Sequence, residues 1–124
     1  MNAFFDNDHL VIIDWKNEVE DTLQDFQRFL PEGFLSYDFS DEENVILRVG
    51  DRSEAVTLAP RYPSIPLADR VRRLLRPEFE APCLQDSLGS DTACYLVRPA
   101  VWWQEFRTTY PERFATLFTD ADHA

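Results

Sequence analysis

Histidine, cysteine, glycine and lysine are all scarce in this sequence of 124 residues, and each shortage excludes a class of site. The chain has two His, two Cys and three Gly, and Lys16 is its single lysine beside 11 arginines. Two cysteines are too few for a disulfide framework. His9 and His123 lie near the two ends with no motif around either, which disfavours a Ser–His or Cys–His nucleophile pair. No glycine-rich pattern of a phosphate-binding loop occurs.

Long apolar runs are also absent. None approaches the roughly 20 residues that a transmembrane helix needs, and no basic region precedes the short apolar run near the N-terminus. We therefore expect no membrane span, no secretion signal and a cytoplasmic location. Cys83 and Cys94 lie 11 residues apart around a turn-like segment, so they could face each other across a hairpin. In a reducing compartment we expect free, half-buried thiols.

The composition is otherwise that of a folded protein. Hydrophobic residues make up 44% of the chain, including 10 Phe, 4 Tyr and 3 Trp. This content separates the sequence from disordered chains, and the length suits one domain that spans residues 1–124.

An amphipathic helix is predicted over residues 14–30. Its apolar residues recur every three or four positions and share one face, while acidic residues occupy the other. Asp14 suits the N-cap position, and Pro31 and Gly33 follow the end. The apolar stripe comprises Trp15, Val19, Leu23, Phe26 and Leu30.

Alternating apolar residues after this helix predict a β-meander with strands at 34–39, 44–50 and 54–59. The residues expected to face inward are Leu35, Tyr37, Phe39, Val45, Leu47, Val49, Val56 and Leu58. The short run at 9–13 suits either a strand or a first helical turn.

The second half of the chain predicts a helix at 66–76, a hairpin of strands at 78–84 and 93–98, and a helix at 99–110 with a short helix after Pro111. Pro82 cannot donate a ladder hydrogen bond, so we expect the first hairpin strand to lie at an edge or to contain a bulge. In the helix at 66–76 we expect Leu67, Val71, Leu74 and Leu75 to be buried and Arg70, Arg72, Arg73 and Arg76 to be exposed. The order (β)αβββαββα predicts an α+β fold, an antiparallel sheet of about five strands with helices packed mainly on one face.

The net charge of −11 is concentrated in the first half of the chain. Residues 1–60 contain 14 Asp or Glu against four Lys or Arg, whereas residues 61–124 contain nine against eight. Such a field repels nucleic acid and anionic membranes and attracts basic proteins. The alternative interpretation is that the charge only keeps the protein in solution.

The acidic turn Asp41–Glu43, with Asp38 beside it, offers oxygen ligands of the kind that a hard cation such as Ca²⁺ needs. It lacks the spaced ligands and the distal Glu of a calcium loop, so a solvated hairpin turn is favoured and no metal or cofactor is expected. The arginines of the helix at 66–76 favour a solvated face that pairs with the acidic half, rather than a nucleic-acid interface.

In size, acidity and general make-up the whole chain resembles the small acidic immunity proteins of bacterial toxin–immunity systems, such as those of contact-dependent growth inhibition or type VI secretion. The resemblance implies a non-catalytic inhibitor that binds a cognate toxin domain, often a basic nuclease. Under this hypothesis the contacts come from an acidic face built by the helix at 14–30 and the turn that follows the first meander strand. Its residues are Glu18, Glu20, Asp21, Asp25, Asp38, Asp41, Glu42 and Glu43.

Two other functions stay open at this point. One is an adaptor or secretion chaperone that forms a homodimer through its C-terminal aromatic residues and binds another protein. The other is a small enzyme that uses carboxylates, alone or with a metal ion.

Overall fold

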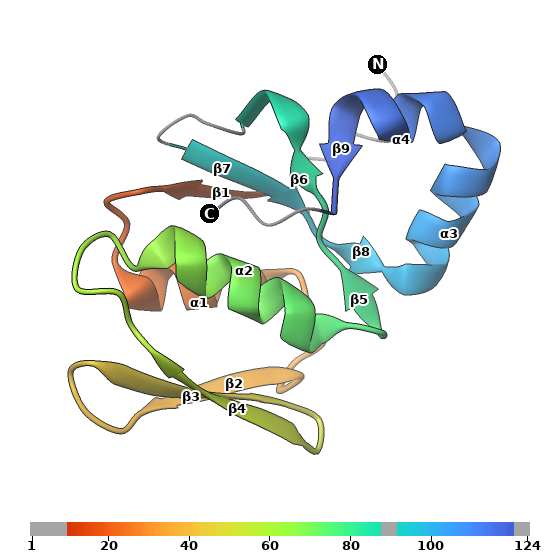
Figure 1. The fold of residues 1–124 in the computed structure, drawn as a ribbon. Helices are drawn as coiled ribbons and strands as arrows, with labels where there is room; N and C mark the ends of the chain where they lie inside the picture. Colours follow the sequence, from red (N-terminus) through yellow and green to blue (C-terminus); the bar gives the residue numbers. More distant parts are fainter. Residues whose placement is uncertain (1–9, 88–91, 121–124) are drawn as a thin grey trace.

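The structure is a computed structural model that describes residues 10–87 and 92–120 (Figure 1). His9, His123 and most of the loop between the hairpin strands lie outside this range. The helices are α1 (Val19–Arg28), α2 (Ser64–Leu75), α3 (Ala100–Thr109) and α4 (Pro111–Leu117), with a short 3₁₀ turn at Gln85–Ser87. The strands are β1 (Leu10–Asp14), β2 (Leu35–Phe39), β3 (Asn44–Val49), β4 (Arg52–Thr57), β5 (Phe79–Glu80), β6 (Cys83–Leu84), β7 (Thr92–Leu96), β8 (Arg98–Pro99) and β9 (Phe118–Thr119).

The strands form three antiparallel sheets rather than one. Their orders are β1-β7-β6-β9, β2-β3-β4 and β5-β8. Helices α1 and α2 lie between the first two sheets, and α3 and α4 lie to one side (Figure 1). The prediction of an α+β fold with antiparallel strands is confirmed. The prediction of a single sheet of about five strands was wrong, because the strands divide between the two sides of the helical layer and a separate pair, β5-β8.

The meander occurs as predicted, with small shifts at the strand ends. Val45, Leu47 and Val49 of β3 are fully buried, as the alternation predicts. Phe39, which was expected to face inward, is 42% exposed. It ends β2 beside the start of α1, where the helical layer no longer covers the sheet.

Helix α1 begins five residues later than predicted. The run before it is a strand, β1, which pairs with β7 from Leu10 opposite Leu96 to Asp14 opposite Thr92. The Asp14 carboxylate accepts a hydrogen bond from the Lys16 N–H at 2.9 Å, in the turn that follows β1. The helix then starts at Val19 without a side-chain cap. The prediction of Asp14 as the N-cap was therefore wrong.

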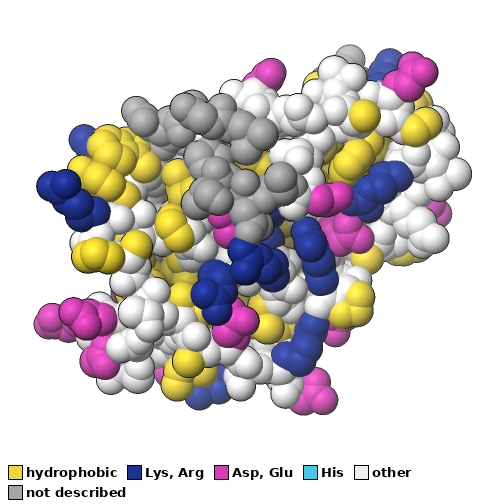
Figure 2. Space-filling model, viewed as in Figure 1, with side chains coloured by type: hydrophobic (Ala, Val, Ile, Leu, Met, Phe, Trp, Pro, Cys, Tyr) yellow, Lys and Arg dark blue, Asp and Glu magenta, His cyan; other side chains and the backbone are white. Residues whose placement is uncertain are grey.

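Helix α2 starts two residues earlier than predicted, at Ser64, whose hydroxyl donates to the Asn17 carbonyl at 2.7 Å. Figure 2 shows Lys and Arg side chains gathered over this helix on one face of the molecule. Three of the four arginines are partly or fully exposed, namely Arg70, Arg73 and Arg76. Arg72, in contrast, is only 1% exposed. The prediction that Arg72 faces water was wrong, because a helix between two sheets buries most of its surface.

The predicted second hairpin is divided in the structure. The segment around Pro82 separates β5 from β6, so that β5 pairs with β8 while β6 pairs with β7. Cys83 lies opposite Tyr95, whereas Cys94 lies opposite Ile12, so the two cysteines are not cross-strand partners. Neither cysteine forms a disulfide, as expected.

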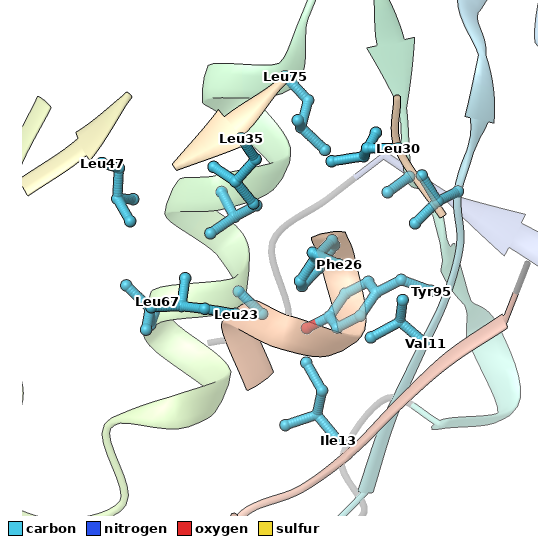
Figure 3. Packing of buried hydrophobic residues seen from close by; sticks show 14 of the residues in the cluster. Val11, Ile13, Leu23, Phe26, Leu30, Leu35, Leu47, Leu67, Leu75 and Tyr95 are labelled. Atoms are coloured by element: carbon cyan, nitrogen blue, oxygen red, sulfur yellow. The ribbon is translucent and has the colours of Figure 1, made fainter. Parts of the chain in front are cut away.

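Two hydrophobic cores follow from this arrangement. The larger one joins both sheets through the helical layer, and Figure 3 shows Phe26, Leu23 and Tyr95 packed at its centre. The smaller one contains Leu96, Trp103, Phe106 and Phe118 between α3, α4 and the four-stranded sheet. No helix within residues 10–87 and 92–120 has the length and apolar character needed to cross a bilayer.

The buried pair of Arg72 and Asp69 generates a stability prediction. We expect Arg72→Met to lower the free energy of unfolding by about 3–5 kcal/mol, because it leaves the Asp69 carboxylate buried without its arginine. Urea unfolding followed by circular dichroism measures the change. The control Arg61→Met alters an exposed arginine and should stay within about 0.5 kcal/mol of the parent protein. Equal losses in the two variants would contradict this account of Arg72.

Candidate protein-binding face

A cleft of about 890 Å³ opens between the start of α1 and the turn that joins β2 to β3. Five carboxylates line it: Glu18, Glu20, Asp21, Glu42 and Glu43. The remainder of the lining is mainly apolar and comes from Val19, Phe39 and residues 57–60 and 63. We call this feature the acidic cleft. Two chain segments that are remote in sequence thus bring their carboxylates to one site.

Local structure explains how each segment presents its charges. The start of α1 carries unpaired backbone N–H groups and a partial positive charge, which stabilise carboxylates in the first turn such as Glu20 and Asp21. The β2–β3 turn is organised by Asp41, whose carboxylate accepts hydrogen bonds from the Glu43 N–H at 2.8 Å and from Asn44 Nδ2 at 3.0 Å. These bonds hold the pKa of Asp41 below its ordinary value, the backbone N–H of Glu43 being the larger cause.

The three other predicted contact residues lie outside the acidic cleft. Asp41 lies within the turn and shapes it. Asp25 is half-buried on α1 and forms an ion pair with Arg28 at 3.2 Å. Asp38 extends from the outer face of the three-stranded sheet, where it pairs with Arg48 at 2.5 Å. The structure therefore brings five of the eight predicted residues together, and two of the others already contact an arginine of the same chain.

Sequence reasoning missed the apolar part of the cleft. Phe39 and Leu58 were both expected to face inward, and both line the cleft. Both lie at the end of the three-stranded sheet nearest α1. One signal was available, because Phe39 directly precedes a polar turn at the end of a strand, where helical cover is least certain.

The charge in the acidic cleft has one sign. Among the residues that the structure describes, no Lys or Arg lines it, and Figure 2 shows Asp and Glu side chains gathered at the tip that the β2–β3 turn forms. A concave surface with apolar walls concentrates such a field and attracts cationic side chains. Arginine and lysine of another protein are therefore the groups that this surface suits best.

The exposed arginines of α2 lie outside the acidic cleft, and Arg70 is engaged within the chain. Arg70 Nε donates to Glu54 at 2.7 Å, which matches the predicted pairing between this helix and the acidic half. Arg52 of β4 pairs with Glu78 at 2.6 Å in the same region. Within the described residues, no group of three or more His, Cys, Asp or Glu side chains is placed to hold a metal ion.

The C-terminal aromatic residues mostly contact each other rather than water. Trp103 is buried and its Nε1 donates to the Glu80 carbonyl at 3.0 Å. Trp102 is half-buried and stacks on Phe106, with the ring centroids 5.4 Å apart. The homodimer alternative would use the apolar surface that this packing leaves exposed, which includes Val101 at 62% and Tyr110 at 40% exposure.

Comparison of the chain with protein-family models, with curated proteins and with solved structures finds no match. The features of the acidic cleft that bear on function are its five carboxylates, its apolar lining with Phe39, and its open side.

The hydrogen bonds to Asp41 generate a pH prediction. In an NMR titration we expect the Asp41 carboxyl group to titrate below the ordinary value of 3.8, because both donors favour its charged form. A lowered folded-state pKa stabilises the fold above pH 3.8, and this contribution is lost as the pH falls through the folded-state pKa. Asn44→Ala removes one donor and should move the midpoint back toward 3.8.

The matched control is Thr57→Val, which removes a contact to the Asn44 side-chain oxygen but none to Asp41. It should leave the Asp41 midpoint unchanged. A midpoint at or above 3.8 in the parent protein would show that the turn is not organised by this carboxylate.

Proposed function

We propose that this protein is a non-catalytic inhibitor of the immunity-protein class, which binds and neutralises a cognate toxin domain through the acidic cleft. The partner that suits the cleft best is a basic domain, such as a nuclease. The observation that carries the proposal is one open cleft that, within the described part of the chain, is lined by five carboxylates and by no Lys or Arg.

The electrostatics of such a complex are favourable. A nuclease has a positive cleft because it binds phosphate, and a surface of opposite sign raises the rate of encounter and disfavours other partners. Arginine side chains of the partner can bind carboxylates with two parallel hydrogen bonds, which adds geometric specificity. Bound in this way, the inhibitor occupies the surface that the nucleic acid needs.

The cleft is supported by rigid elements, which lowers the entropic cost of binding. Glu20 and Asp21 lie on the first turn of α1, whose Leu23 and Phe26 are fully buried. Glu42 and Glu43 lie in the turn that Asp41 organises. The carboxylates therefore keep their spacing before the partner arrives.

The proposed contact set is centred on the five carboxylates of the acidic cleft. Asp38 and Asp25 lie at its margins, where a partner has to share them with Arg48 and Arg28. We expect these two residues to contribute less than the central five, because an exposed ion pair that is already formed gains little from a second cation.

Affinity capture from the source organism, with bound proteins identified by mass, tests the proposal. We expect one stoichiometric basic partner that is retained at low salt and weakened as the salt concentration rises. The toxic activity of that partner should fall as the complex forms. Retention that is indifferent to salt would contradict the electrostatic basis of the proposal.

Charge reversal tests the site itself. We expect Glu20→Lys/Asp21→Lys, and separately Glu42→Lys/Glu43→Lys, to weaken the purified partner's affinity about tenfold or more, because each variant replaces two attractions by two repulsions. Isothermal titration calorimetry at low salt measures the effect. The control Glu105→Lys/Glu112→Lys has the same change in net charge on the exposed surfaces of α3 and α4. Equal losses in the control would assign the effect to net charge and overturn the assigned site.

A further inference from the structure

One edge of the three-stranded sheet presents unused backbone groups toward the acidic cleft. The Ser40 N–H donates to the Asn44 carbonyl at 3.1 Å, so this pair is hydrogen-bonded across the strands. Antiparallel pairs alternate, so Asp38 also bonds to β3, while the N–H and C=O groups of Tyr37 and Phe39 point away from β3. Strand β2 is the last strand of its sheet, and these groups form its open edge.

The opposite edge, β4, is protected in a way that β2 is not. Arg52 and Glu54 lie on its inner face, opposite Val49 and Leu47, and inward-pointing charges discourage the addition of a further strand. The corresponding inner-face residues of β2 are aromatic: Tyr37 and Phe39 contact each other edge to face, with ring centroids 5.8 Å apart. No proline interrupts β2.

Helix α1 runs alongside this open edge. Near one end of β2, Gln27 Nε2 donates to the Leu35 carbonyl at 2.9 Å. Near the other end, Glu20 lines the acidic cleft together with Phe39. Residues 20, 24 and 27 share one face of a helix, so Glu20, Gln24 and Gln27 form a polar row beside the edge. A second hollow of about 450 Å³, lined by Gln27 and Glu32 among others, lies at the Leu35 end.

We propose that an extended basic segment of the partner protein adds to the open edge of β2 as a fourth strand. Its backbone would pair with Tyr37 and Phe39, its apolar side chains would pack on those two rings, and Lys or Arg side chains beyond the paired residues would reach the acidic cleft at the end of β2. This inference rests on the proposed function and specifies how the partner is bound. Strand addition of this kind gains affinity from main-chain hydrogen bonds and specificity from alternate side chains.

The negative charge at the ends of the β2 edge indicates which chain segment would pair with it. Among the described residues, five carboxylates line the hollow at the Phe39 end, Glu32 lines the hollow at the Leu35 end, and neither hollow is lined by Lys or Arg. A second copy of this chain, paired edge to edge, would bring the carboxylates of the two copies close together. Like charges across an interface are costly, so a basic segment is favoured over self-pairing.

Peptide probes test the pairing directly. The probe is an eight-residue peptide of alternating Lys and Val with blocked ends, and the measurement is amide hydrogen exchange by NMR at low salt. We expect saturating peptide to slow exchange of the Tyr37 and Phe39 amides about tenfold, because only ladder hydrogen bonds protect them. A peptide with Glu in place of Lys should leave both amides unchanged.

The matched control peptide has the same sequence and charge but carries N-methyl groups on its four central residues. Its four central residues cannot donate to a β-ladder from either edge, so we expect it to give no protection at the Tyr37 and Phe39 amides. Equal protection by this peptide, or no protection by the unmodified one, overturns the proposal. Edge-to-edge dimerisation of the free protein would also overturn it.

Variants separate the backbone contribution from that of the ring. Tyr37→Ala removes the ring, whereas Tyr37→Pro removes the ring and the outward N–H. We expect Tyr37→Pro to bind the peptide less tightly than Tyr37→Ala, and Ala55→Pro, which alters the outward N–H on β4, to bind it normally. If the captured partner is lost on charge reversal but binds Tyr37→Pro and Tyr37→Ala equally, the inhibitor function stands and edge pairing is wrong. If charge reversal leaves capture unchanged, the proposed function itself is wrong.

Discussion

A guanidinium group with almost no access to water lies at the centre of the molecule, and its neighbours compensate its charge. Arg72 Nε donates to the Ala81 carbonyl at 2.6 Å, its Nη1 lies 3.1 Å from the Asp69 carboxylate, and its Cζ is 4.8 Å from the centroid of the Tyr95 ring. A buried charge without such partners costs several kcal/mol. These contacts therefore tie α2 to the segment between β5 and β6 and to β7, so the helical layer and the four-stranded sheet have one relative arrangement.

The position of the candidate site follows from that arrangement. Helix α1 packs beside α2 in the same layer, so its first turn lies next to the β2–β3 turn. The convergence of five carboxylates is unfavourable in isolation, because like charges repel. The buried contacts of Leu23 and Phe26 hold α1 in place despite this repulsion. Some local features lower the stability of a fold that nevertheless tolerates them. Such features are expected on a surface that binds a partner.

Much of the fold could be predicted because local periodicity reports which face of an element is apolar. The alternation in β3 and the stripe through Leu23 and Phe26 both correspond to buried residues. Periodicity does not show whether another element covers the polar face. Arg72 is on the polar side of the pattern in α2, yet a second sheet covers that side as well. The prediction of Asp14 as the N-cap was wrong for a related reason, since the segment before α1 pairs with β7 and the chain then turns before the helix starts.

Residue order accounts for the types of most elements, the inward face of the meander, and the concentration of negative charge in the first half of the chain. These properties depend on residues that are neighbours in the chain or one helical turn apart. Three-dimensional packing accounts for the pairing of β1 with β7, for the shared cleft of Glu20 and Glu43, and for the position of the open edge of β2 beside Glu20. Such juxtapositions join segments far apart in sequence. They are selected by the burial of both sheets against one helical layer, which no short window of residues contains.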